Sequence, residues 1–183
     1  MRKLKFHEQK LLKKHDFFKN WTGEDNHHEV KVIKRYHIQN REDYERYNKI
    51  CGLVTSLICK LKLLDEKDQF RVKITEQLLE KLYNLGLVNQ RENVMAAEKL
   101  TVSAFCRRRL PVVMQINKFA QTVKEAVTYI EQGNVRIGPE KITDPAFLVS
   151  RNLEDHIEWM DQSKIKKKIL EYKDKMDDYD IQE

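Results

Sequence analysis

The feature that most constrains how this chain folds is a periodic run of apolar residues between positions 44 and 64. Steps of three and four place these side chains on one face of a helix of about six turns, and that face must be buried. The apolar positions are Tyr44, Tyr47, Ile50, Cys51, Val54, Leu57, Ile58, Leu61 and Leu64. Asn40 precedes the run and can cap the helix. We therefore interpret the two tyrosines as packing residues rather than as platforms on which a base stacks.

A second amphipathic helix is expected after the polar run at 64–70. Thr75 would open this helix, and Gly86 would end it because glycine readily adopts the positive φ found at many helix ends. The inward-facing positions are Leu78, Leu79, Leu82 and Tyr83. Together the two helices predict a helical domain over residues 41–104.

The periodicity changes after Leu100. Two short helical pieces are expected on either side of the arginine triplet 107–109, and Thr122 with Glu125 forms a capping box for a further helix. After Gly133 the sequence favours short strands, at 134–150 and again at 156–159. These strands are interrupted at Gly138-Pro139 and Asp144-Pro145. The expected fold class is mainly α with a small β-sheet, which is confined to about residues 134–160.

Charge is distributed unevenly along the 183 residues, whose formal net charge is +6. Residues 1–20 hold seven cations against Glu8 and Asp16, and a helix there would be amphipathic through Leu4, Leu11 and Phe18. We interpret residues 1–40 as a basic N-terminal arm. Two hypotheses remain open for it, a solvated helix packed on its own domain and an arm that orders on RNA or a partner. Within the arm, the sequence leaves residues 29–38 undecided between helix and strand.

The C-terminal residues 161–183 form a charged tail that we expect to be only partly ordered. Its lysines come first and its acids last. The lysine cluster consists of Lys164, Lys166, Lys167 and Lys168.

Several classes of protein are disfavoured by the sequence. No apolar run approaches the roughly 18 residues of a membrane span, and the basic N-terminus lacks the apolar core of a secretory signal. Cys51, Cys59 and Cys106 are odd in number and form no C-x-x-C pair, so we expect reduced, buried, intracellular thiols. Gly-rich phosphate loops and G-x-S-x-G or H-E-x-x-H motifs are also lacking. We therefore predict no enzyme activity, no cofactor and no metal site.

The residues that favour a function are cations near a capped helix. Thr122 and Lys124 lie where a helix N-terminus presents free N–H groups to anions, and the arginine triplet could flank that point. Arg136 and Lys141 would add charge from the strands. Each of them taken singly is more often a solvated charge, but together they suggest a phosphate clamp. Because successive helical residues turn by about 100°, we expect one arginine of the triplet to be structural, paired with an acid such as Asp155 or Glu158.

The stretch from Cys106 to Trp159 resembles the S4 RNA-binding domain. It matches in the arginine-rich R-R-L, the helix pair, G-x-V-R-I-G and D-P-x-F-L-V. Residues 40–88 resemble the helical half of the small-subunit ribosomal protein of that family. Residues 2–14 and 36–44 are similar to the Imp-type assembly relatives, which are components of the U3 small nucleolar ribonucleoprotein. The implied S4 domain spans residues 105–160.

The resemblance implies a helix pair on a small bent sheet, with RNA held between the first helices and the strand edge. The implied RNA contacts are Arg107, Arg108, Arg109, Lys118, Gln121, Thr122, Lys124 and Arg136. One departure from the family is Gly138-Pro139-Glu140, where many S4 domains have Asn-Gly-Lys. An anion replaces a cation at the hairpin tip, which weakens any phosphate contact there.

The implied function is RNA binding in the nucleolus, promoting the pairing of U3 small nucleolar RNA with pre-rRNA for early small-subunit rRNA processing. The implied protein partners are the M-phase phosphoprotein of the U3 particle and a Brix-domain companion. One alternative is a permanent ribosomal protein of the same family. Another is a protein scaffold that docks through its helical half and binds no structured RNA.

Overall fold

The computed structural model describes residues 3–14, 23–91 and 94–173 of the chain. The chain divides into two units, residues 1–35 and 36–183. The first unit contains helices α1 (Phe6–Lys14) and α2 (Gly23–Tyr36). Residues 29–36, which the sequence left undecided, are therefore helical. On α1 and just before it, Leu11 and Leu4 are both exposed, whereas Phe18 lies outside the described residues.

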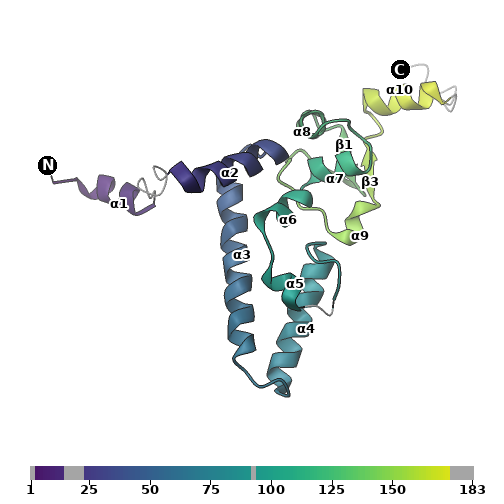
Figure 1. Cartoon of the computed structure of the whole chain (residues 1–183). Coiled ribbons are helices and arrows are strands. Elements are labelled where there is room, and N and C mark those ends of the chain that lie inside the picture. Colours follow the sequence, from purple (N-terminus) through teal and green to yellow (C-terminus); the bar gives the residue numbers. More distant parts are fainter. Residues whose placement is uncertain (1–2, 15–22, 92–93, 174–183) are drawn as a thin grey trace. The chain divides into compact units, whose positions relative to one another are not determined.

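Two antiparallel helices dominate the first part of the second unit (Figure 1). Helix α3 (Arg41–Lys62) confirms the long helix predicted from the apolar periodicity. Its buried apolar residues are Tyr47, Cys51, Val54, Ile58 and Leu61. The predicted face was too wide, however, because Ile50, Leu57 and Leu64 are exposed along one flank. Asn40 occupies the N-cap position but its side chain makes no capping hydrogen bond.

Helix α4 (Gln69–Asn84) begins six residues earlier than the predicted start at Thr75. The reason is the Asp68 side chain, whose Oδ1 accepts a hydrogen bond from the backbone N–H of Phe70 at 2.9 Å. This is the bond expected of an N-cap aspartate, so the polar run is part helix cap rather than all loop. The helix ends as predicted, with Gly86 at a φ of 74°.

Two short helices return the chain along this hairpin. They are α5 (Val94–Glu98) and α6 (Val102–Arg107). The ring of Phe105 on α6 stacks on Tyr47 of α3, with centroids 5.4 Å apart and an interplanar angle of 7°. Tyr47 is therefore a packing residue, as predicted.

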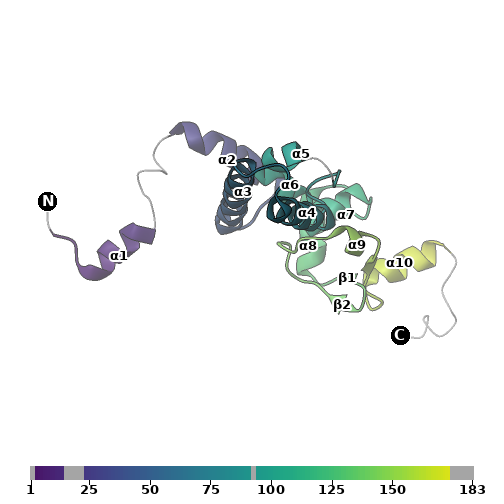
Figure 2. The same ribbon diagram turned by 90° about the horizontal axis from the view of Figure 1, so that it is seen from below.

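The C-terminal part contains a helix pair covering a small sheet (Figure 2). The helices are α7 (Leu110–Ile116) and α8 (Val123–Glu131), and the capping box of Thr122 and Glu125 is present. The antiparallel sheet has the order β2-β1-β3. Its strands are β1 (Val135–Ile137), β2 (Glu140–Lys141) and β3 (Ile157–Trp159). The short helix α9 (Arg151–Glu154) precedes β3.

Inward-facing side chains of the helix pair and sheet form one apolar core. Leu110, Met114, Ile130, Val135 and Ile157 are among its members. The fold class is therefore mainly α with one small sheet at the predicted place. The segment after Asp144-Pro145 forms only an isolated bridge between Leu148 and Arg109.

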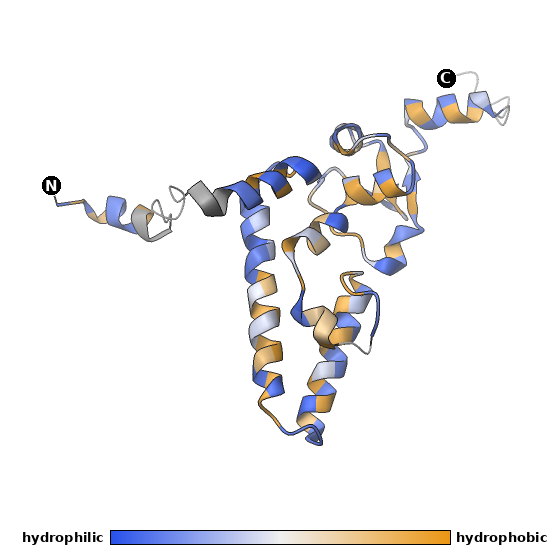
Figure 3. Ribbon diagram, in the orientation of Figure 1, coloured by the Kyte–Doolittle hydropathy of each residue, from blue (hydrophilic) through white to orange (hydrophobic). Residues whose placement is uncertain are grey.

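The charged tail begins as a helix, α10 (Lys164–Tyr172), in which hydrophilic and hydrophobic residues alternate (Figure 3). Residues 174–183 lie outside the described part of the chain. Cys51 and Cys106 are buried as predicted, but Cys59 is exposed. Within the described residues, no helix is both long and apolar enough to cross a bilayer. Those residues also contain no group of three potential metal ligands.

Candidate nucleic-acid interface

The arginine triplet lies at the junction of α6 and α7, and its three side chains have different environments. Arg107 is exposed, and among the described residues its side chain donates only to the Ser103 carbonyl one turn earlier, at 3.3 Å from Nε. Arg108 and Arg109 are directed into the protein. Arg107 is thus the member of the triplet that is available to a ligand.

Arg109 is a core residue, with a side chain only 2% exposed. Its Nη1 donates to Oδ2 of Asp43 at 3.0 Å and to the Tyr47 hydroxyl at 3.3 Å. Burial raises the pKa of Tyr47, so the hydroxyl keeps its proton and accepts this bond as a neutral group. The arginine joins α3 to the start of α7, and this arrangement leaves no side-chain surface for RNA.

Arg108 connects the junction of α6 and α7 to α9 and the residues just before it. Its Nε donates to the Val149 carbonyl and its Nη1 to Oε2 of Glu154, each at 2.9 Å. The side chain also crosses Gly86, where an added Cβ would lie 2.8 Å from the guanidinium carbon. Gly86 is therefore needed both for its positive φ and for the passage of this arginine.

Two members of the triplet are structural, so the prediction of a single structural arginine was wrong. The predicted acid partners were wrong as well. The partners are Asp43 and Glu154 rather than Asp155 or Glu158. Asp43 precedes Arg109 by 66 positions, and no local pattern in the sequence points to that pair.

Arg136 on β1 is enclosed by acids. It donates to Oε2 of Glu158 at 2.7 Å and to Oδ2 of Asp161 at 2.6 Å. The hydrogen bond with Glu158, followed by the charge of Asp161, raises the pKa of this guanidinium. Its Nε is buried without a partner among the described residues. Two carboxylates thus offset the charge that was predicted to contact phosphate.

The remaining predicted contacts gather at the turn between α7 and α8. Lys118, Gln121, Thr122 and Lys124 are all exposed. Lys118 adopts a φ of 64° at the end of α7, an unusual conformation for a residue with a side chain. Neither lysine has an ion pair among the residues described.

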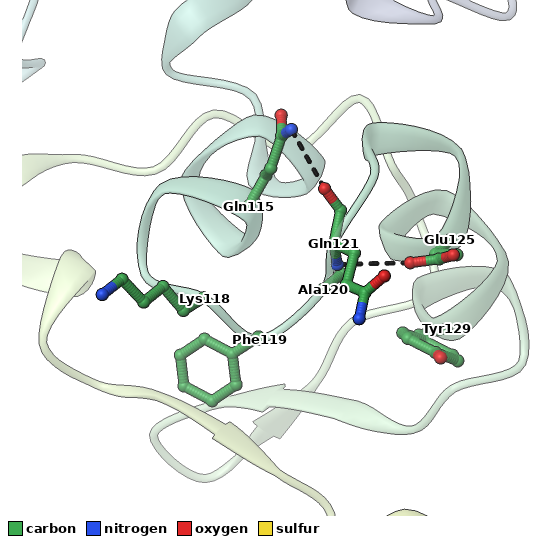
Figure 4. A pocket seen from close by; sticks show the side chains of 7 residues that line it. All are labelled: Gln115, Lys118, Phe119, Ala120, Gln121, Glu125 and Tyr129. Carbon is green, nitrogen blue, oxygen red and sulfur yellow. Dashed lines mark hydrogen bonds between the residues drawn. The ribbon is translucent and has the colours of Figure 1, made fainter.

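This turn borders an open hollow of about 710 Å³ (Figure 4). Its lining residues are Gln115, Lys118, Phe119, Ala120, Gln121, Glu125 and Tyr129. Figure 4 shows the Lys118 amine extending away from Glu125. The rings of Phe119 and Tyr129 are held from behind by edge-on contacts with Trp159, at 5.7 and 5.6 Å between centroids.

The capping box limits how the helix terminus can bind an anion. Oε2 of Glu125 already accepts the backbone N–H groups of Gln121 and Thr122, both at 3.2 Å. A carboxylate therefore occupies the place at the start of α8 where a phosphate would accept the same bonds. What remains for RNA are the side chains of Lys118, Gln121 and Lys124, together with the hollow that Lys118 and Gln121 line.

One structural cation at the junction with the helical half was not predicted from the sequence. Arg151 donates from Nε to the Tyr83 carbonyl at 2.8 Å and from Nη2 to the Val88 carbonyl at 2.9 Å. Its guanidinium also lies 4.2 Å from the centre of the Tyr83 ring. It binds the end of α4 to α9, and no motif marks it because its partners are backbone carbonyls more than 60 positions away.

Comparison with known proteins also divides the chain into a helical half and an S4 half. The family model "Ribosomal protein S4/S9 N-terminal domain" matches residues 3–107, and the model "S4 domain" matches residues 108–155. The boundary between the two matches falls within the arginine triplet.

Individual relatives are similar over the whole length. The U3 small nucleolar ribonucleoprotein protein IMP3 of Saccharomyces cerevisiae is 52% identical, covering 99% of both chains. The protein of that name from Homo sapiens is 51% identical, covering 100% of this chain and 99% of its own. The small ribosomal subunit protein uS4 of Methanothermobacter thermautotrophicus is 28% identical, covering 89% of this chain and 95% of its own.

Proposed function

Because this chain belongs to the family of the U3 small nucleolar ribonucleoprotein protein IMP3, we propose that it is an RNA-binding assembly factor of the small-subunit processome. In this role it promotes the pairing of U3 small nucleolar RNA with pre-rRNA and thereby supports early small-subunit rRNA processing. The observation that carries the proposal is identity of about one half along essentially the full chain. The site of action follows from the relatives' particle and is the nucleolus.

The surface that we assign to RNA is the turn between α7 and α8. Lys118 and Lys124 supply mobile cations, Gln121 supplies an amide, and Phe119 and Tyr129 line the hollow beside them. Lysine side chains suit phosphate, and aromatic rings suit unstacked bases. Arg107 adds an exposed cation from α6. The role is one of binding and positioning, without a chemical step.

Permanent residence in the ribosome is the second candidate. It is favoured by the match to the ribosomal family models, but uS4 is only 28% identical. The two functions differ in where the protein accumulates. A tagged chain that co-sediments with precursor particles and U3 RNA supports the assembly role, whereas co-sedimentation with mature small subunits would assign it to the ribosome.

The pairing activity can be measured directly with purified full-length chain. We expect it to bind transcripts of U3 RNA and of a pre-rRNA fragment, to lose affinity steeply as salt rises, and to accelerate their annealing. Deleting residues 2–20 should slow annealing while leaving the melting temperature of the second unit unchanged, because that segment carries a net charge of +5. A chain that neither binds these transcripts nor accelerates annealing would contradict the assignment.

The protein partner that we propose is the M-phase phosphoprotein of the U3 particle, with the Brix-domain companion nearby. The outer flank of α3 exposes Ile50, Leu53 and Leu57, and Leu53 is 71% exposed. Lys49 and Lys60 border this stripe, and α3 carries no acid after Glu45. The flank therefore suits an amphipathic, acidic helix of the phosphoprotein.

Leu53→Glu should abolish co-purification of this partner while RNA binding persists, because a carboxylate would be placed in the apolar stripe. Phe70→Glu, which alters an equally exposed apolar side chain of α4, is the matched control. Unchanged capture by the Leu53 variant would remove the stripe from consideration.

A further inference from the structure

The helix α10 contains the densest cluster of cations among the described helices and lies outside both matched family models. Four of its first five residues are lysines, and Glu171 is its single acid. It is about 13 Å long, or two to three turns. Nothing in the proposed function at the α7–α8 turn accounts for this helix.

The start of α10 is fixed to the sheet. Ser163 is only 4% exposed, and its hydroxyl accepts the Ile165 N–H while donating to Oδ1 of Asn134, both at 3.2 Å. Asn134 immediately precedes β1, and its carbonyl also accepts the N–H of Met160, just after β3, at 2.8 Å. These bonds fix the start of α10 to the sheet. The rest of the helix projects from the domain (Figures 1 and 2).

An ion-pair relay separates one lysine from the rest. Asp161 accepts hydrogen bonds from both Arg136 and Lys166, and the bond from Lys166, followed by the charge of Arg136, lowers the pKa of this carboxyl. Lys166 is thus paired with the body of the domain. By contrast, Lys164, Lys167 and Lys168 have no ion pair within the part of the chain that the structure describes.

The three lysines that have no ion pair with a described residue share one face. With about 100° between successive residues, Lys164, Lys167 and Lys168 fall within about 100° of the helix circumference. Ile165 and Ile169 lie on the adjacent face and are partly buried. The lysine-bearing face carries three lysines against the single acid Glu171, so the helix presents mainly positive charge to solvent.

We propose that α10 is a second RNA-backbone site, in which Lys164, Lys167 and Lys168 bind phosphates of the RNA held at the α7–α8 turn. This inference rests on the proposed RNA-binding function and extends it. Ser163 and Asn134 are positioning residues, since they act by directing the helix. Contacts of this kind are independent of base sequence, because lysines without a fixed geometry read charge and not base edges.

The test is a triple variant of the full chain, Lys164→Gln, Lys167→Gln and Lys168→Gln. Affinity is measured against salt with two labelled probes, a transcript of U3 RNA and an RNA hairpin of unrelated sequence. For both probes we expect about a tenfold loss at low salt and a salt slope that is shallower by about two to three, since each lost phosphate contact removes nearly one unit. The matched control, Lys67→Gln, Lys73→Gln and Lys81→Gln, changes the net charge equally on exposed positions of the helical half and should leave the slope unchanged.

A second variant tests the orientation of α10 separately from the charge of its lysines. Ser163→Ala keeps every lysine but removes the cap, and we expect about a two- to fivefold loss of RNA affinity that Ser163→Thr restores. Ser163→Ala binding as tightly as the wild type would overturn the positioning role.

The outcomes distinguish this inference from the function on which it rests. If the triple variant keeps the wild-type slope while the wild type binds RNA, the second site is overturned and the proposed function stands. If the wild type binds neither probe, both fail. If the triple variant keeps RNA affinity but loses binding to phosphatidylcholine vesicles containing phosphatidylserine, α10 is a lipid-binding helix instead.

Discussion

The cations of the S4 half have two different roles, depending on whether they face the helical half or solvent. Arg108, Arg109 and Arg151 face inward at the junction, where each meets a carboxylate or backbone carbonyls from a distant part of the chain. Lys118 and Lys124 face outward at the α7–α8 turn without an ion pair among the described residues. Arg109 and Arg151 bond the S4 half to the helical half, and Arg108 bonds the start of α7 to α9 within the S4 half. The two lysines are available to a polyanion.

Desolvation explains the difference. An arginine removed from water is stable only when its charge and its N–H groups are satisfied, so its partners become part of the fold. A solvated lysine keeps its hydration and its rotamers until a phosphate arrives. Loss of a junction cation should therefore be seen in stability, and loss of a turn cation in RNA affinity.

The largest effect is expected for Arg109→Ala. The change removes the buried partner of the Asp43 carboxylate and leaves it only the exposed Arg46, 3.6 Å away, which costs about 3 kcal/mol of unfolding free energy. The measurement is chemical denaturation followed by circular dichroism. Arg107→Ala, which alters the exposed neighbour, should change stability by less than about 0.5 kcal/mol. Equal losses for the two variants would refute the division between junction and surface.

Arg151→Ala is expected to rank second, with a loss of about 2 kcal/mol. The variant forfeits two charged hydrogen bonds to the carbonyls of Tyr83 and Val88. Arg91 is the natural control, since its guanidinium also lies on the Tyr83 ring, at 4.3 Å, but it is exposed. Arg91→Ala should therefore cost only about 0.5 kcal/mol in the same denaturation experiment. A loss for Arg91→Ala as large as that for Arg151→Ala would contradict the weight assigned to the two carbonyl hydrogen bonds of Arg151.

The double change Lys118→Ala and Lys124→Ala should lower RNA affinity rather than stability. We expect RNA affinity to fall about tenfold at low salt and the melting temperature to stay within error, because the two side chains are exposed and form no ion pair with any described residue. Fluorescence anisotropy with labelled U3 RNA measures the first quantity and differential scanning fluorimetry the second. Unchanged affinity would place the primary RNA site elsewhere on the protein.

The smallest effect concerns pH. Burial raises the pKa of Cys106 from about 9 to about 11, so between these values the folded state holds a proton that the unfolded state has lost. This contribution to the free energy of unfolding is fully present below pH 9 and is lost as the pH rises toward 11. At pH 10 the loss amounts to about 1 kcal/mol. Denaturation at pH 8 and pH 10 should show this loss in the wild type. Cys106→Ala should be less sensitive to pH, and identical sensitivity in the two proteins would contradict the assignment.

Periodicity and local chemistry in the sequence predicted most of the elements. The long helix α3, the glycine that ends α4, the capping box of α8 and the sheet within 134–160 depend on residues close together in the chain. Errors occurred where a short-range signal was overlooked or overextended. Asp68 was not recognised as the cap of α4, and the buried face of α3 was drawn too wide at Ile50 and Leu57.

What the sequence alone determined is the long helix α3, the helix pair α7 and α8, the place of the sheet, the family resemblance and the excess of cations near the α7–α8 turn. Only the tertiary structure decided which cations are free. Arg109 and Arg107 are the same residue type two positions apart, yet one meets Asp43 in the core and the other meets solvent. The physical reason is that the role of a charge depends on its burial and its partner. For Arg109 that partner comes from 66 positions away, a separation that folding closes and that no local pattern records.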